Sequence, residues 1–196
     1  VDSSVAAAML LEQGYEVVGI TMRHWDEECE RPAFSRTCCA IDDVNDARRV
    51  AEALGFPHYT LNLRERFNDE VVGDFIREYR EGRTPNPCIV CNRFLKFDAL
   101  MTKAMQLECT HVATGHYGRV EESDGVFRLR KAVDPIKDQS YFLYHLNQET
   151  LPKVLLPLGE IADKDKTREM ARDMGLKVAS KPDSQDICFI PDGDYK

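Results

Sequence analysis

The chain has 196 residues, of which 43% are hydrophobic and 31% charged, enough apolar material for one sizeable core. The 34 Asp and Glu outnumber the 26 Lys and Arg, and the net charge of −8 argues against a surface that binds nucleic acid or an anionic membrane over its whole area. A net negative charge still allows a basic groove on one part of the surface. No apolar run approaches the roughly 18 residues of a membrane-spanning helix, and residues 1–16 lack the marks of a secretion signal, so we expect a soluble, cytoplasmic protein without membrane contact.

Helix and strand signals alternate along the chain. Apolar residues spaced three and four apart, with capping and glycine signals, predict helices, and short apolar runs predict strands. In chain order the predicted elements are helix 3–13, strand 15–22, helix 42–54, strand 57–63, helices 65–81 and 92–106, strand 111–115, a hairpin over 119–131, helical segments 141–145, 149–155 and 164–174, and a short strand 186–190. Such alternation is typical of one α/β domain with a parallel sheet.

The first predicted helix begins with Asp2, Ser3 and Ser4. Backbone N–H groups and hydroxyls at the positive end of a helix dipole form a site for phosphate. The same residues also suit an ordinary helix cap, so both interpretations stay open on these three residues alone. The strand that should precede this helix in a βα unit is missing, and we expect the chain to start inside a motif.

Seven cysteines, an odd number, favour catalytic, sulfur-handling or metal-binding thiols over a disulfide framework. Cys88 and Cys91 form a C-x-x-C pair at the entry to a helix, where the dipole stabilises thiolates, and the same spacing suits a metal. Cys188 supplies a third thiol. A structural zinc site needs four ligands, and the sequence has no second C-x-x-C or H-x-x-x-H to complete one. The three thiols therefore favour sulfur transfer, or a cluster that keeps one iron open.

Five motifs carry a resemblance to a known family. Residues 1–4 (VDSS) look like the second half of the SGGVDSS loop of the PP-loop ATP pyrophosphatases. With 84–92 (TPNPCIVCN), 113–117 (ATGHY), 137–143 (KDQSYFL) and 184–190 (SQDICFI), the whole chain resembles the tRNA-specific 2-thiouridylases. The resemblance implies a Rossmann-like doubly wound α/β PP-loop domain that binds ATP at the carboxyl ends of its strands. It also implies ATP-dependent replacement of the 2-oxygen of the wobble uridine by sulfur in the tRNAs for Lys, Glu and Gln, through an adenylated intermediate.

The resemblance also implies roles for individual residues. Cys188 is implied to carry a persulfide charged by an upstream sulfur-relay protein, and Cys91 to release the sulfur or to close a disulfide with Cys188. Asp2 is implied to act on the ATP phosphates through magnesium. The implied ATP-binding residues are Val1, Asp2, Ser3, Ser4, Met22 and Gly115. The implied contacts to the target base or the tRNA are Asn86, Pro87, Cys88, His116, Lys137, Asp138 and Gln139.

The chain departs from the family pattern in two ways. Many members carry Asp at the position of Cys88, so Cys88, Cys91 and Cys188 could instead hold three irons of a four-iron four-sulfur cluster whose fourth iron binds hydrosulfide. The persulfide and cluster routes both stay open. Family members also continue into a central domain and a β-barrel that contact tRNA. Residues 1–196 are therefore expected to be the catalytic domain, without its first strand and the Ser-Gly-Gly of the loop, and inactive on tRNA alone.

Two rival functions remain beside this one. An amide-forming PP-loop ATP pyrophosphatase lets ammonia attack an adenylated substrate and needs no cysteine, so the three thiols speak against it. A non-catalytic ATP-binding redox module would bind ATP without releasing pyrophosphate and would use the thiols as a switch.

Charged residues give two further predictions. Binding of tRNA by an acidic chain requires clustered cations that act mostly through phosphates, and the candidates are Arg80, Arg83, Arg93, Lys96, Lys131 and Lys137. The run 163–166 (DKDK) is predicted to be a solvated helix start.

Overall fold

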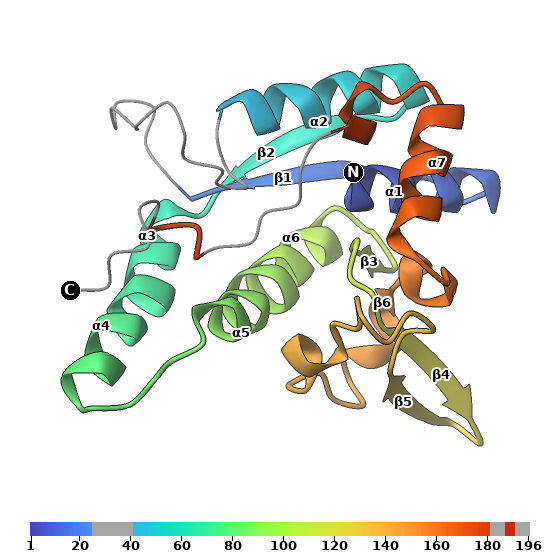
Figure 1. Ribbon diagram of the computed structural model, residues 1–196. Helices are drawn as coiled ribbons and strands as arrows, with labels where there is room; N and C mark the ends of the chain where they lie inside the picture. Colours follow the sequence, from blue (N-terminus) through green and yellow to red (C-terminus); the bar gives the residue numbers. More distant parts are fainter. Residues whose placement is uncertain (25–40, 181–186, 191–196) are drawn as a thin grey trace. The chain divides into compact units, whose positions relative to one another are not determined.

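The computed structural model describes residues 1–24, 41–180 and 187–190 (Figure 1). The chain divides into two compact units. The first unit consists of Val1–Val17 and Ile89–Ser180, and the second unit of Val18–Cys88 and Lys181–Lys196. None of the helices within the described residues is long and apolar enough to cross a membrane.

The second unit contains a parallel strand pair and a long helical segment. Strand β1 (Gly19–Arg23) pairs in parallel with β2 (His58–Asn62), with Gly19 opposite His58, and α2 (Ile41–Leu54) packs against both strands. A run of three helical stretches follows without a break: α3 (Arg64–Phe67), the π-helical η1 (Asn68–Val72) and α4 (Gly73–Arg80). Its buried side chains Phe67, Val71 and Phe75 recur every four residues and form one apolar stripe.

The first unit contains the second parallel strand pair. Strand β3 (Val112–Ala113) pairs in parallel with β6 (Val154–Leu155), and α1 (Asp2–Glu12) packs against α7 (Lys164–Asp173). The helix that leads into β3 comprises α5 (Pro87–Cys91), the π-helical η2 (Asn92–Ala99) and α6 (Leu100–Gln106). The main core cluster of this unit is formed by Phe97, Met101, Ala104, Val112, Leu143, Leu146, Leu151 and Val154.

A β-hairpin extends from the first unit (Figure 1). Strands β4 (Arg119–Ser123) and β5 (Val126–Arg130) pair antiparallel, and the two turn residues Asp124 and Gly125 both have positive φ. This left-handed pair matches the twist of the flanking strands, and Asp-Gly is a preferred sequence for it. Four short 3₁₀ turns complete the unit: η3 (Ser140–Leu143), η4 (Leu151–Lys153), η5 (Pro157–Glu160) and η6 (Lys177–Ser180).

The α/β class and the parallel pairing are confirmed, and the structure corrects two predicted elements. The predicted helix 149–155 is the turn η4 followed by strand β6, because Val154 and Leu155 pair with β3 instead of continuing the turn. The predicted strand 186–190 is, over the described residues 187–190, a turn in which Ile190 N donates to Ile187 O at 3.0 Å. Both errors fall on short apolar runs, for which periodicity does not separate helix from strand.

Candidate active site

The start of α1 lies against the segment that follows β3. Gly115 comes two residues after the end of β3, and a Cβ at this position would lie 2.6 Å from Ser3 N and 2.8 Å from Asp2 Cβ. Carbon atoms do not approach so closely, so a larger residue would push α1 away. The structure thereby makes neighbours of Asp2, Ser3 and Gly115, three of the predicted ATP-binding residues.

A polar cluster, which we call the Asp2 network, holds the carboxylate at this helix start. Lys164 Nζ lies 2.5 Å from both carboxylate oxygens of Asp2. The Tyr117 hydroxyl lies 3.4 Å from Asp2 Oδ1 and 2.8 Å from Thr167 Oγ1, and Thr167 is fully buried. Lys164 Nζ also lies 5.6 Å from the centre of the Tyr117 ring. These contacts fix the carboxylate beside the first turn of α1.

Lys164 corrects the prediction for 163–166. Asp163 caps α7 by accepting a hydrogen bond from Lys166 N at 2.8 Å, and Asp163 and Lys166 are both exposed, as a solvated helix start requires. The Lys164 side chain, in contrast, is only 11% exposed because it lies on the Asp2 carboxylate. No local signal distinguishes it from Lys166, since its partner lies 162 positions away in the sequence.

The remaining predicted ATP-binding residues have separate surroundings. Val1 precedes α1, and its carbonyl accepts the hydrogen bond of Val5 N at 3.0 Å, while Ser4 is half-buried in the first turn. Met22 belongs to the second unit, on β1, where it lies opposite Leu61 of β2.

The start of α1 has the chemistry of a phosphate site. The first turn of an 11-residue helix presents N–H groups at the positive end of the dipole, and the Ser3 side chain there is exposed. The ammonium of Lys164 adds a positive charge. The Asp2 carboxylate supplies the oxygen ligand that magnesium prefers when phosphates supply others, so the residues present fit a magnesium nucleotide.

The C-x-x-C pair lies at the start of the helix that begins at Pro87, with Cys88 as its second residue and Cys91 as its fifth. Asn86 Oδ1 accepts a hydrogen bond from Cys88 N at 3.2 Å, so Asn86 caps the helix, and Pro87 occupies the first helical position, which needs no donor. Cys88 is exposed and Cys91 is half-buried. The helix thus starts five residues earlier than the predicted 92–106, and both thiols lie near its positive end.

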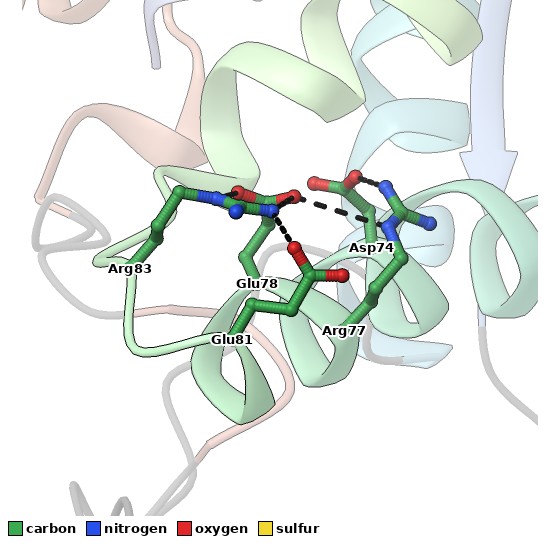
Figure 2. Close-up of polar contacts among 5 residues, drawn as sticks. All are labelled: Asp74, Arg77, Glu78, Glu81 and Arg83. Carbon is green, nitrogen blue, oxygen red and sulfur yellow. Dashed lines mark hydrogen bonds and ion pairs between the residues drawn. The ribbon is translucent and has the colours of Figure 1, made fainter.

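The turn before this helix is held by an exposed cluster, which we call the Arg83 network (Figure 2). Arg83 Nη2 lies 2.7 Å from Glu78 Oε1 and 2.5 Å from Glu81 Oε2, and Arg83 N donates to Glu78 O at 2.9 Å. Arg77 bonds Asp74 in the same cluster. The Arg83 hydrogen bond is the main cause that lowers the pKa of Glu78. Three carboxylates therefore surround two guanidinium groups, which disfavours Arg83 as a contact to tRNA phosphates.

The segment that carries Cys188 is anchored by the next residue. The Phe189 ring packs edge-on against Phe67 at 5.8 Å and against Phe75 at 5.1 Å, between ring centroids. His24 also stacks on Phe67, with the ring centroids 4.8 Å apart. Cys188 itself is half-buried, and the preceding motif residues 184–186 lie outside the described part of the chain. Phe189 therefore holds the Cys188 turn on the α3–α4 helix.

The predicted tRNA-contact loop 137–139 uses two of its three side chains for its own structure. Asp138 Oδ1 accepts a hydrogen bond from Ala132 N at 2.8 Å, and Asp138 Oδ2 accepts one from Ser140 Oγ at 2.8 Å. Gln139 Oε1 accepts from Tyr117 N at 3.0 Å. Asp138 and Gln139 thus shape the loop that also carries the half-buried Lys137.

His116 is buried directly after Gly115. Its Nδ1 lies 2.8 Å from Thr114 Oγ1, and its ring lies 6.1 Å from Phe97. Burial, then the charge of Lys96 and then that of His145, hold the pKa of His116 well below its ordinary value. The imidazole is therefore neutral at physiological pH, and it can donate or accept one hydrogen bond but carries no charge toward RNA.

The predicted iron ligands are placed only in part. Cys88 and Cys91 are three residues apart on one helix and so lie on one side of it, which is compatible with two ligands of a cluster. Within the described residues, no three His, Cys, Asp or Glu side chains form a group that could hold a metal ion. The cluster stays a prediction.

The parallel strand pairs and the helix start beside Gly115 define an α/β nucleotide-binding domain of the PP-loop type. The chain belongs to the family described as the tRNA methyl transferase HUP domain, whose model matches residues 1–192.

Named relatives are similar to the chain over its whole length. The tRNA-specific 2-thiouridylase MnmA of Carboxydothermus hydrogenoformans is 55% identical, and that of Magnetococcus marinus is 52% identical. Each alignment covers 100% of this chain and 54% of the relative, so the chain spans about half the length of these proteins. Among solved structures, the NMN synthetase of Francisella tularensis aligns with 93% of this chain and 62% of its own, at 15% identity and a TM-score of 0.48.

Proposed function

We propose that this chain is the ATP-using catalytic part of an enzyme that replaces the 2-oxygen of the tRNA wobble uridine by sulfur. The observation that carries the proposal is the start of α1, where Asp2 and Ser3 lie against Gly115 and Lys164 lies on the Asp2 carboxylate. The choice of acceptor and of sulfur as the transferred atom is supported by two relatives, 55% and 52% identical, that are named tRNA-specific 2-thiouridylases.

The first step is activation of the uridine. The ATP phosphates bind at the first turn of α1, where the backbone N–H groups and Lys164 balance their charge, and Asp2 would supply an oxygen ligand to a magnesium ion bound with them. The uridine O2 attacks the α-phosphorus and pyrophosphate leaves. The 2-oxygen, a poor leaving group, then departs as part of AMP.

The second step transfers sulfur. The terminal sulfur of a persulfide on Cys188 attacks C2 of the uridine, and AMP leaves. The Cys91 thiolate then attacks the Cys188 Sγ, which breaks the S–S bond, releases 2-thiouridine and forms a Cys91–Cys188 disulfide. A dithiol reductant restores both thiols. Cys91 suits this role because it is a half-buried thiol three residues from Cys88 on the same helix.

The finer assignments rest on the resemblance to the 2-thiouridylases. The acceptors are the tRNAs for Lys, Glu and Gln. In the persulfide route an upstream sulfur-relay protein, itself carrying a persulfide, transfers the outer sulfur to Cys188, and inorganic sulfide serves as the donor only in the cluster route described next. The enzyme works in the cytoplasm, where thiols stay reduced. The alternative sulfur route binds a four-iron four-sulfur cluster on Cys88, Cys91 and Cys188, and anaerobic iron and sulfide analysis of the purified protein separates the two routes.

The deciding experiment is nucleoside mass spectrometry. The full-length protein that contains this chain is incubated with ATP, magnesium and unmodified tRNAs for Lys, Glu and Gln, with a persulfide-carrying sulfur donor in one reaction and, for the cluster route, with sulfide under anaerobic conditions in another. We expect 2-thiouridine that depends on ATP and disappears in Cys188→Ala. Cys109→Ala is the matched control, since Cys109 is a half-buried thiol at the edge of the first unit's core whose Sγ lies 3.9 Å from the Leu107 carbonyl.

The other outcomes point to the rival functions. A methylated uridine in place of 2-thiouridine would support the methyl transfer that the family description names. Release of AMP and pyrophosphate without thiolation, unchanged in Cys188→Ala, would favour an amide-forming enzyme with another acceptor. ATP binding without pyrophosphate release would favour the redox module.

A further inference from the structure

Two tyrosines at the turn η3 face solvent, Tyr141 within the turn and Tyr144 as its C-cap. Tyr141 and Tyr144 are 64% and 67% exposed. Residues three apart in a 3₁₀ turn lie on the same side of it, so the two rings share one side. Leu143 and Leu146, also three apart, belong to the buried core cluster. The leucines thus anchor this turn to the core, while the two tyrosine rings stay in contact with solvent. The hydrophobic effect alone disfavours such exposure of large rings.

The loop before the turn has a defined backbone. Asp134 Oδ1 accepts hydrogen bonds from Ile136 N at 2.8 Å and Lys137 N at 3.2 Å, and Asp138 ties the loop to Ala132 and Ser140. The carboxylates of Asp134 and Asp138 are thus turned to backbone amides. Ile136, at 88% exposure, adds an apolar side chain to the surface of the same loop.

Positive charge lies on the elements around the tyrosines. Helix segment η2, which carries Arg93 and Lys96, packs against η3. Burial, and secondly the charge of Arg93, lower the pKa of His145, whose ring lies 6.2 Å from that of Tyr144. Lys137 lies in the loop just before the turn. Exposed aromatic rings beside cations are the combination with which proteins hold unpaired nucleotides.

We propose that Tyr141 and Tyr144 form a stacking surface for unpaired bases of RNA, with Arg93 and Lys137 contacting the adjoining phosphates. This inference rests on the proposed function, because it takes the anticodon loop of the tRNA as the ligand. Stacking explains why rings of this size are left in water, since every base offers a π-face and needs no specific hydrogen bond. The nearby cations favour a polyanion over an apolar protein partner.

The test measures RNA binding and not chemistry. The full-length protein is titrated into a fluorescently labelled, unmodified anticodon stem-loop and into a fully paired RNA of equal length. We expect the double variant Tyr141→Ala, Tyr144→Ala to bind the stem-loop about tenfold or more weakly and the paired RNA unchanged. The double variant Tyr141→Phe, Tyr144→Phe keeps the rings and should bind as the wild type does.

Tyr59→Ala is the matched control. Tyr59 is a tyrosine of similar exposure, 56%, but it lies on strand β2 of the second unit and not on the turn η3. Wild-type affinity in the alanine double variant would overturn the stacking surface, and so would equal losses in the phenylalanine and alanine double variants. Binding that depends on the tyrosines, in an enzyme that forms no 2-thiouridine, would overturn only the proposed reaction. Thiolation with unaltered binding by the alanine variant would overturn only this inference.

Discussion

The Asp2 network and the Arg83 network are both ion-pair clusters, yet they differ in reach and in exposure. Lys164 meets Asp2 across 162 positions of sequence, with side chains 11% and 33% exposed. Arg83 meets Glu78 five positions away, and its side chain is 53% exposed. Long-range, partly buried pairs join elements that no local propensity brings together, whereas exposed local pairs contribute little because water and salt screen them. The comparison predicts that changes near Asp2 affect the protein far more than changes near Arg83.

The largest effect is expected from Gly115→Ala. The added Cβ would meet Ser3 N at 2.6 Å, so α1 or the segment after β3 must shift, at a cost of about 2 kcal/mol in the free energy of unfolding and with loss of ATP binding. Urea denaturation and calorimetric titration with ATP measure the two effects. Gly73→Ala is the control, because this helical glycine has only the Asn68 carbonyl at 3.4 Å and should tolerate a methyl group. Equal behaviour of the two variants would contradict the close contact.

The next effect is expected from Lys164→Met. The change leaves the partly buried Asp2 carboxylate without its cation and removes a positive charge from the proposed phosphate site, so we expect a loss of about 1–2 kcal/mol in stability and about tenfold weaker ATP binding. Lys166→Met, on the same helix but exposed, serves as the control. If both variants bind ATP like the wild type, the Asp2 network has no part in the nucleotide site.

A pH-dependent effect of intermediate size is expected from His116. Its pKa is lowered in the folded protein, and in the unfolded chain the imidazole protonates near 6.5. Below about pH 6.5 the unfolded state therefore binds more protons than the folded state does. The free energy of unfolding decreases as the pH falls from there toward the pKa of the folded protein, by at most about 1.4 kcal/mol per pH unit for this group. His116→Gln should flatten this dependence in urea denaturation between pH 7 and pH 5. Parallel pH profiles of the variant and the wild type would show that the histidine is not buried as described.

The smallest effect is expected from Arg83→Met. Its bonds to Glu78 and Glu81 lie in solvent, so we expect a small change in the unfolding midpoint that vanishes in 1 M salt. Thermal unfolding at low and high salt measures it. A loss as large as that of Lys164→Met would erase the distinction between the two networks and would show that the turn before Asn86 contributes to overall stability.

Much of the fold follows from short stretches of sequence. Apolar spacing and the stops at Gly14, Gly55 and Gly82 predict α1, α2 and the α3–α4 helix, because these signals act within a few residues. Asp124-Gly125 predicts the hairpin turn for the same reason. The motifs also predict a phosphate site at Asp2, and they place the C-x-x-C pair at a helix start, as the structure has it.

Tertiary structure alone decided the rest. The segment that ends in Val154 and Leu155 is a strand and not a helix because β3 offers a parallel partner, and a pattern of apolar residues does not encode which partner is present. In the sequence, Lys164 belongs to a charged run that predicts a solvated helix start. In the structure its ammonium contacts the Asp2 carboxylate, because α7 packs against α1. Phe189 likewise finds Phe67 and Phe75 only after the chain returns to the α3–α4 helix. Local propensities thus determined the elements and the motifs, while the contacts that complete the site depend on packing between segments far apart in the chain.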